Sequence, residues 1–255
     1  MSERRKLGWG DWLFAVLMLA LCATCLWLGS WQMQRLAEKE ALIAAVDIRL
    51  TAAPMPVPPQ DQWDSLDTQA LVYQPVELTG AYRYTQTVTV FTSLSDAKGQ
   101  YAGPGYWVVT PFVLEGGGTV FINRGFVPQQ YQETAAIGDL HGDDPGIVTI
   151  SGVFRSAEAA GMATPEADMS NRIEWVRDPA RLAQMVDPAL APIAPFYVDL
   201  PAGAPGELPQ GGETVVSFPN NHFGYALTWY GFAIVGFVML GFWLHQRGRR
   251  PDPVA

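Results

Sequence analysis

The fold is decided by 22 consecutive residues without a formal charge near the C-terminus, FGYALTWYGFAIVGFVMLGFWL at 223–244. An α-helix of about 20 apolar residues can cross the roughly 30 Å of hydrocarbon in a bilayer. A second run, WLFAVLMLALCATCLWLGS at 12–30, meets the same requirement near the N-terminus. The sequence therefore predicts two transmembrane helices, at 12–30 and 223–244, that flank one large domain at 31–222.

The positions of lysine and arginine predict the orientation, because these residues concentrate on the cytoplasmic side of a membrane. The tails, 1–11 and 245–255, carry six of them close to the spans, and the near flanks of the central domain carry three. We expect both tails to be cytoplasmic and the domain to be periplasmic or in the intermembrane space. The N-terminus lacks the long Arg- and Ser-rich run of a mitochondrial transit peptide, which favours a bacterial inner membrane.

The domain between the spans is expected to be β-rich. Its β-branched and aromatic runs are short and are separated by Gly and Asp turns. Strands are predicted at 76–83, 88–91, 106–114, 119–123, 148–155, 196–200 and 214–217. This pattern indicates an α+β domain built on an antiparallel sheet or small barrel. Asp178 as an N-cap, followed by Pro179, predicts a helix that reaches Val186.

The connections around these elements are also predictable. Apolar residues at helical spacing after Trp31 indicate that the first span continues as a juxtamembrane helix, which the prolines at 54–59 stop. The segments 156–171 and 201–212 are expected to be loops, the latter mobile.

Two of the expected strands resemble each other, since V-x-L-x-G-x-Y-R at 76–83 matches V-x-I-x-G-x-F-R at 148–155. A glycine inside a strand often marks a bulge or a close approach of two backbones. We interpret Gly80 and Gly152 as two solutions of one barrel-corner problem. An ancient duplication is the alternative, which eight residues leave open.

Charge and motifs exclude several functions. The domain at 31–222 has ten basic and 22 acidic residues, a net charge of −12, so nucleic acid is not an expected partner. The sequence has no P-loop, zinc-protease motif or nucleophile elbow, and we expect no enzyme. Cys22 and Cys25 have the C-x-x-C spacing of redox and copper sites. Inside a span we expect them to be inert packing residues, because metals and thiol partners arrive through water.

His222, at the mouth of the second span, is the strongest candidate for a functional residue, because ionisable groups at that depth cost free energy. On a helix, positions 222, 225 and 229 share a face, which places His222, Tyr225 and Trp229 in one column. Histidine commonly holds haem iron, and aromatic rings can flank a porphyrin. An interfacial histidine among membrane-anchoring aromatics is the alternative that the spacing leaves open. His141 lies in a turn-like string and is expected to be solvated.

Four blocks of the chain resemble the Surfeit-locus family of cytochrome oxidase assembly factors. They are LGSWQMQRLAEK at 28–39, VTPF at 109–112, NRGFVP at 123–128 and NNHFGYALTWYG at 220–231. The resemblance implies an assembly factor for a haem–copper terminal oxidase, which binds haem a transiently and aids its insertion into the catalytic subunit. The implied partners are that subunit, the machinery of haem a synthesis and the lipid bilayer.

The resemblance also implies roles for individual residues. His222 corresponds to the proposed ligand of the haem iron, and Trp229 to a residue linked to the same site. Gln32 and Arg35 emerge on the same side of the membrane, where they would hydrogen-bond a propionate or formyl group or anchor the helix end. Arg124 would pair with propionates or brace a tight turn. The alternative function is a membrane-anchored interaction scaffold, which stabilises an oxidase assembly intermediate without carrying haem.

Overall fold

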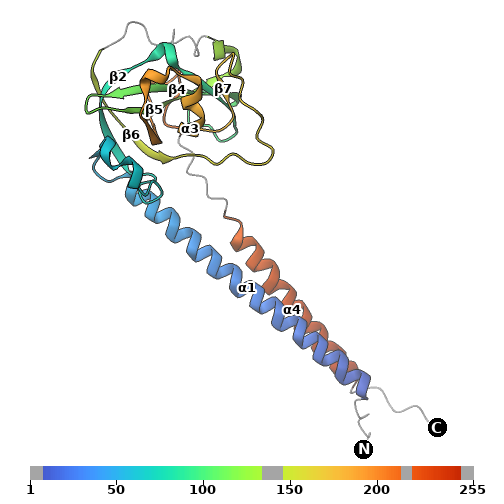
Figure 1. Ribbon diagram of the computed structural model, residues 1–255. Helices are drawn as coiled ribbons and strands as arrows, with labels where there is room; N and C mark the ends of the chain where they lie inside the picture. The colour runs from blue at the N-terminus through green and yellow to red at the C-terminus, as the bar shows by residue number, and fades with distance from the viewer. Residues whose placement is uncertain (1–7, 134–145, 214–219, 248–255) are drawn as a thin grey trace, which may run out of the picture. The chain divides into compact units, whose positions relative to one another are not determined.

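The computed structural model describes residues 8–133, 146–213 and 220–247. The chain separates into two compact units. Figure 1 shows both, with the chain coloured by residue number. The helical unit comprises Met1–Ala45 and Ser217–Ala255, and the β unit comprises Val46–Val216. The predicted strand at 214–217 lies outside the described residues.

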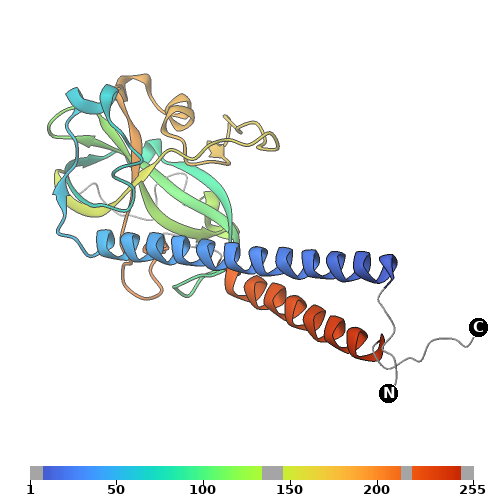
Figure 2. The same cartoon turned by 90° about the horizontal axis from the view of Figure 1, so that it is seen from below.

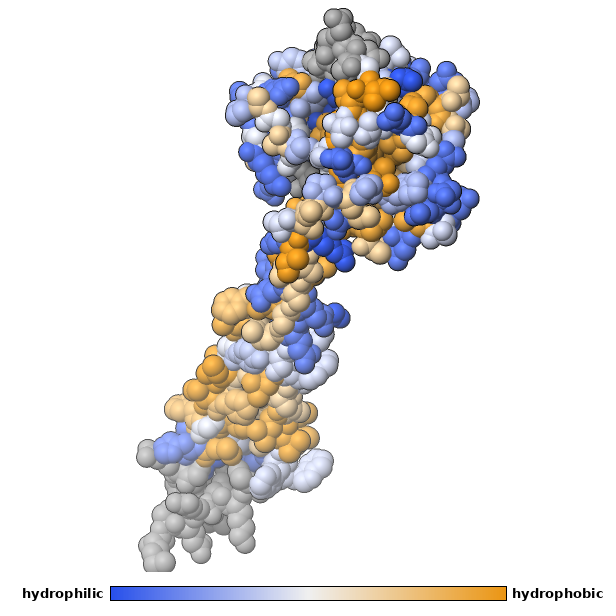
Figure 3. Space-filling model, turned by 90° about the vertical axis from the view of Figure 1, so that its left-hand side faces the viewer, coloured by the Kyte–Doolittle hydropathy of each residue, from blue (hydrophilic) through white to orange (hydrophobic). Residues whose placement is uncertain are grey.

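Two helices, α1 (Trp9–Leu50) and α4 (His222–Arg247), form the helical unit, and the last turns of α1 belong to the β unit. Both are long and apolar enough to cross a membrane. On the face drawn in Figure 3, apolar side chains cover much of this helix pair. α1 continues without a break past residue 30, as the juxtamembrane prediction requires, and ends before Pro54.

The helices lie side by side and antiparallel (Figures 1 and 2). Their less exposed positions recur in alternating steps of four and three residues, the 3.5-residue period of left-handed coiled coils. In α1 these are Asp11, Ala15, Met18, Cys22, Cys25, Gly29 and Gln32; in α4 they are His222, Ala226, Trp229, Ala233, Gly236, Leu240, Trp243 and Arg247. We call these two rows the seam. Small residues along it let the backbones approach closely.

Contacts along the seam show how close that approach is. A Cβ on Gly236 would lie 2.6 Å from Cys22 Sγ, and one on Gly29 would lie 2.7 Å from the ring of Tyr230. Cys22 and Cys25 are buried free thiols, in agreement with the predicted packing role. At one end of the seam Arg247 Nη2 lies 3.0 Å from Asp11 Oδ1. Asp11 is therefore part of the helix pair rather than of the N-terminal tail.

Five strands of the β unit form a closed barrel. They are β2 (Pro75–Tyr82), β4 (Gly103–Leu114), β5 (Thr119–Pro128), β6 (Val148–Ser156) and β8 (Ile193–Asp199). The order is β2-β6-β8-β5-β4, and the β2–β4 pairing closes the ring. β3 (Val88–Leu94) extends the sheet beside β4, and the two-residue strands β1 (Met55–Pro56) and β7 (Ile173–Glu174) pair with β2 and β3.

The small-barrel prediction is confirmed, but the sheet is not wholly antiparallel, because β5 and β8 run parallel. The reason is geometric: strand directions cannot alternate all the way around a ring of five, so one pair must be parallel. The two short strands, which were not predicted, also pair in parallel.

The two similar strands, β2 and β6, are antiparallel neighbours, with Gly80 opposite Val148 and Gly152 opposite Val76. At Gly80, β2 begins to pair with β4, and a Cβ there would overlap the carbonyl oxygen of Val113. A Cβ on Gly152 would overlap the side chain of Val198 in β8. Each glycine therefore lies where its strand passes close to another strand, as the corner interpretation predicts.

Both faces of β4, β5 and β8 are buried, which explains their nearly continuous apolar sequences. One core cluster contains Phe112, Ile122 and Phe196, and the other contains Trp107 and Phe121 on the opposite faces. A short helix, α3 (Pro179–Leu182), adds Leu182 to the second cluster. In the described part of the chain the 3₁₀ turns are Gln60–Ser65, Tyr84–Gln86, Gln129–Tyr131, Ala183–Met185 and Pro188–Leu190.

The helix predicted at 179–186 is shorter than expected. Asp178 does accept a hydrogen bond from the Ala180 N–H at 3.0 Å, as an N-cap should. After Leu182 the chain tightens into the 3₁₀ turn Ala183–Met185. Leu182 and Met185 are buried against the sheet, and this burial stabilises the segment without further helical turns.

Candidate functional site

The candidate site is centred on a hydrogen bond between the two helices of the helical unit. His222 is the first residue of α4, and its half-buried ring places Nδ1 2.7 Å from Oε1 of Gln32 in α1. Both residues belong to the seam. The sequence predicted that Gln32 emerges on the same side as His222, and the structure joins the two directly.

This hydrogen bond determines which nitrogen of the His222 ring carries a proton. A carboxamide oxygen only accepts hydrogen bonds, so Nδ1 of His222 carries the proton. In the neutral ring Nε2 then carries the lone pair, and among the described residues it has no hydrogen-bond partner. Close by in sequence, Oδ1 of Asn220 is buried and also has no partner.

The aromatic residues of the predicted column divide between two faces. Trp229 is half-buried on the seam, two helical turns from His222, and its ring lies 6.1 Å from that of Phe232. Tyr225 is 58% exposed and lies off the seam, where Ala226 takes the buried position. The seam side chains of α4, which face α1, follow the 3.5-residue period. Tyr225 is close to His222 on the helix surface but does not follow that period.

Tyr230 supplies a second contact near the site. Its hydroxyl lies 3.3 Å from Ser30 Oγ, and its ring packs on Gly29. This contact is one turn or less from Gln32 along α1. It fixes how α1 and α4 pass each other next to the His222–Gln32 pair.

Arg35 has different partners. Its Nη1 lies 2.8 Å from Glu38 Oε2 in an exposed ion pair, and its guanidinium lies 5.6 Å from the centre of the Trp31 ring. Arg35 lies within α1, which continues to Leu50, so it does not stand at a helix end. A role of Arg35 toward a haem substituent stays a prediction.

Arg124 lies in β5 of the β unit. Its guanidinium is 5.2 Å from the ring centre of Tyr84 and 5.9 Å from that of Tyr82, and these two rings stack on each other. Burial lowers the pKa of Arg124 and raises the pKa of Tyr82. The next residue, Gly125, has φ +136° and no room for a Cβ against the backbone of Gln210. These contacts fit the bracing role, and the propionate role stays a prediction.

Sequence reasoning missed a cluster of buried charges in the β unit. Arg177 pairs with Glu158 and Asp199, and it lies between the rings of Trp107 and Tyr197, at 4.9 and 5.3 Å from their centres. Burial alone would raise the pKa of Glu158, but the charge and hydrogen bonds of Arg177 outweigh it and hold that pKa below its ordinary value. These residues come from separate segments without a motif, so nothing in the sequence pointed to them.

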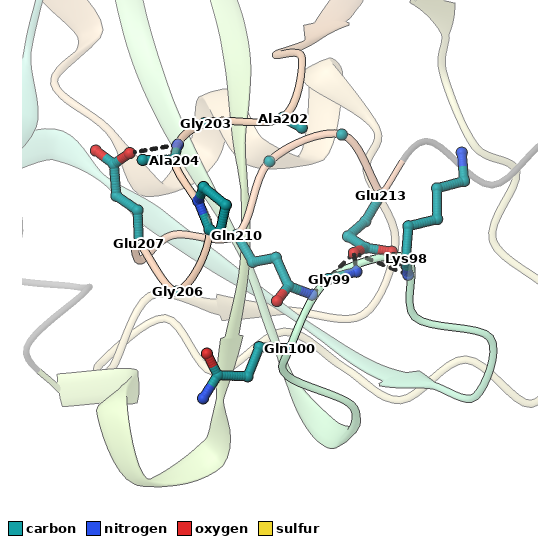
Figure 4. Close-up of a pocket in the computed structure, with 13 residues that line it drawn as sticks. Lys98, Gly99, Gln100, Ala202, Gly203, Ala204, Gly206, Glu207, Gln210 and Glu213 are labelled. Carbon is teal, nitrogen blue, oxygen red and sulfur yellow. Dashed lines mark hydrogen bonds between the residues drawn. The ribbon is translucent and has the colours of Figure 1, made fainter.

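The loop at 201–212, predicted to be mobile, helps to line a cavity of about 410 Å³ in the β unit (Figure 4). Gln210 and Glu213 are buried and tie it to the segment 98–101. Oε1 of Glu213 accepts hydrogen bonds from the Gly99 N–H at 2.7 Å and from Gln210 Nε2 at 2.8 Å. Gln210 also exchanges two hydrogen bonds with the backbone of Tyr101. The two buried side chains of this cavity, Gln210 and Glu213, therefore bind each other and the neighbouring backbone.

The donor set at His222 suits haem better than a bare metal ion. Within the described residues, no three His, Cys, Asp or Glu side chains come together. A structural or catalytic zinc ion requires three or four such ligands. Haem brings four nitrogens of its own and takes one or two axial ligands from the protein. One imidazole with an unpaired nitrogen meets that need.

Comparison with known proteins gives one consistent result. The SURF1 family model matches residues 19–234. Surfeit locus protein 1 of Mus musculus is 32% identical over 228 residues, which cover 84% of this chain and 70% of that protein. The Homo sapiens protein of the same name is 30% identical over 84% of this chain and 72% of its own length. The SURF1-like protein of Monosiga brevicollis is 29% identical over 88% of this chain and 84% of its own.

Proposed function

Because the chain belongs to the SURF1 family, which is linked to cytochrome oxidase assembly, we propose that it is a membrane-bound assembly factor for a haem–copper oxidase. In this proposal it binds haem a as a transient cargo and aids its insertion into the catalytic subunit. Its partners are that subunit and the machinery of haem a synthesis. It is not an enzyme.

In the membrane arrangement we propose, the two candidate spans supply the crossing and the positions of lysine and arginine supply the orientation. α1 and α4 cross a bacterial inner membrane, both tails are cytoplasmic and the β unit is periplasmic. His222 and Gln32 then lie near the outer surface of the bilayer, at the level where a helix leaves hydrocarbon. A flat amphipathic cargo whose propionates face water fits such a position.

One observation carries the haem-binding part of the proposal: His222 is half-buried, Nδ1 is bonded to Gln32, and Nε2 has no partner in the part of the chain that the structure describes. Nδ1 is held by Gln32, and Nε2 supplies one axial ligand to the cargo iron. Trp229 lies on the same seam, where its indole packs against the macrocycle. A single protein ligand leaves the second axial position open, so the cargo stays exchangeable.

The test is an optical titration of the purified full chain with haem a. Wild-type protein should shift the Soret band, and His222→Ala should lose most of that shift. His245→Ala is the matched control, because His245 lies at the other end of α4 and is exposed. If His222→Ala binds haem a as wild type does, the assignment of the iron ligand is wrong.

A second candidate function, the interaction scaffold, is favoured by a partly exposed aromatic cluster on the β unit. Phe91 lies 5.1 Å from Trp175 and 5.6 Å from Tyr106, centre to centre, and Trp175 is 36% exposed. Exposed tryptophan and tyrosine are typical of protein interfaces. The two functions differ in cells that lack haem a: a scaffold still co-purifies with the oxidase subunit, whereas association driven by the cargo is lost.

A further inference from the structure

The His222–Gln32 hydrogen bond determines more than the position of the ring. A neutral imidazole has two tautomers, and only the nitrogen without a proton can bind a metal. Which tautomer is present depends on the partner of the other nitrogen. Here that partner is the carboxamide oxygen of Gln32, at 2.7 Å from Nδ1.

We propose that Gln32 is a positioning residue that holds His222 as the Nδ1–H tautomer and so leaves the Nε2 lone pair for the cargo iron. The role toward iron rests on the proposed function. The tautomer itself is a property of the chain without any ligand. Metal-binding histidines commonly donate their second N–H to an oxygen acceptor in this way.

The surroundings of Gln32 support a fixed geometry. It occupies a seam position of α1, and the packing of Gly29 on the Tyr230 ring lies three residues away. The Ser30–Tyr230 contact ties the same turn of α1 to α4. Because the seam sets the register of the two helices, the carboxamide is presented to the first residue of α4. Gln34, two residues further along α1, is exposed and off the seam.

The first experiment reads the tautomer without haem. Full-length protein in detergent, with labelled histidine and with His141→Gln and His245→Gln, gives one histidine signal in long-range ¹H–¹⁵N NMR spectra at alkaline pH. Wild-type Gln32 should show a protonated Nδ1. Gln32→Glu keeps an acceptor and should show the same, whereas Gln32→Leu should shift the ring toward protonation at Nε2. A wild-type ring protonated at Nε2, or an unchanged ring in Gln32→Leu, overturns the proposal.

The second experiment measures affinity for haem a by titration of the same proteins. Loss of an outer-shell partner of a ligating histidine typically weakens binding about 10–100-fold, and we expect that loss for Gln32→Leu. Gln32→Glu should bind within a few-fold of wild type, and Gln34→Leu should bind as wild type. If Gln32→Leu changes the tautomer but binds haem a normally, Gln32 has no positioning role.

The two experiments separate this inference from the proposed function. If His222→Ala and wild type bind haem a equally, the iron ligand lies elsewhere and the role of Gln32 toward iron is overturned with it. The NMR result for the ligand-free chain is unaffected in that case. If His222→Ala loses haem a and Gln32→Leu does not, the proposed function stands and the inference about Gln32 fails.

Discussion

In the helical unit, charged side chains pair at an end of the seam, as Asp11 and Arg247 do, whereas in the β unit ions are paired in the interior. Arg177 and Asp199 are both buried between strands. The contrast is the one expected if α1 and α4 cross a membrane, as we propose. Hydrocarbon offers no partner to a charge, so a membrane helix keeps its ions near water. A barrel can bury ions when strands and loops supply opposite charges and hydrogen bonds.

The same contrast suggests where function lies. In the β unit, Arg177 pairs with Glu158 and Asp199, and Glu213 accepts a hydrogen bond from Gln210. Three buried atoms of this unit, Arg155 Nη1, Glu174 Oε2 and Arg181 Nε, have no hydrogen-bond partner among the described residues, but each belongs to a side chain that is paired through another atom. In the helical unit, His222 keeps one nitrogen without a partner among the described residues. A half-buried group with an unused lone pair is the better candidate for binding a ligand.

Breaking the buried ion cluster should have the largest effect. Arg177→Met removes the main countercharge of Glu158 and one of the two arginines that pair with Asp199, the other being Arg155. Loss of one partner of a buried pair typically costs about 3–5 kcal/mol. The free energy of unfolding of the β unit should fall by that amount in denaturant titrations of the full chain. Arg83→Met, at an exposed arginine, should change it by no more than about 0.5 kcal/mol. Equal effects of the two substitutions would show that the cluster does not stabilise the barrel.

Overpacking the seam should have an intermediate effect on the helical unit. Gly236→Leu forces a side chain against Cys22 Sγ, 2.6 Å from the position of a Cβ, and overpacking typically costs about 1–3 kcal/mol. The distance between spin labels on exposed positions of α1 and α4 should increase. Gly241→Leu is the control, since a Cβ there meets no atom within 4 Å. An unchanged distance in Gly236→Leu would mean that the seam does not hold the pair together.

Acid should weaken the β unit by a smaller amount. The folded-state pKa of Glu158 lies below its ordinary value of 4.5, so its contribution to stability is present above that value and is lost as pH falls through the folded pKa. Because the carboxylate is partly exposed, we expect a loss of about 1 kcal/mol or less. The free energy of unfolding, measured by denaturant titration at several acidic pH values, should fall less steeply with decreasing pH for Glu158→Gln than for wild type. The same pH dependence in both proteins would exclude Glu158 as a source of the acid sensitivity.

Local sequence patterns predicted the elements well where one physical effect dominates. Six strands, the long first helix and the Asp178 cap were expected, because hydrophobic period and capping chemistry act within a few residues. The parallel pairing of β5 with β8 was not expected, since it depends on the number of strands in the ring. The seam position of Trp229 and the exposure of Tyr225 depend on the crossing of two helices distant in sequence.

For the candidate site too, some features were predictable from sequence and others required the structure. His222 could be identified from sequence because it is an ionisable residue next to 22 uncharged ones. Placing an ionisable side chain in hydrocarbon costs free energy, so such a residue is a candidate for function. Its hydrogen bond to Gln32, which selects the reactive nitrogen, required the register between α1 and α4. The Arg177 cluster was invisible to sequence analysis because its members come from four separated segments.

Length, hydrophobic period and local charge act along the chain, so they were enough to predict two apolar helices, a β-rich domain between them and His222 as a candidate ligand residue. The closure of the barrel, the ion pairs in its interior and the nitrogen of His222 that Gln32 binds became visible only in the folded chain. Those features depend on contacts between residues far apart in sequence, and such contacts form only when the backbone brings the segments together.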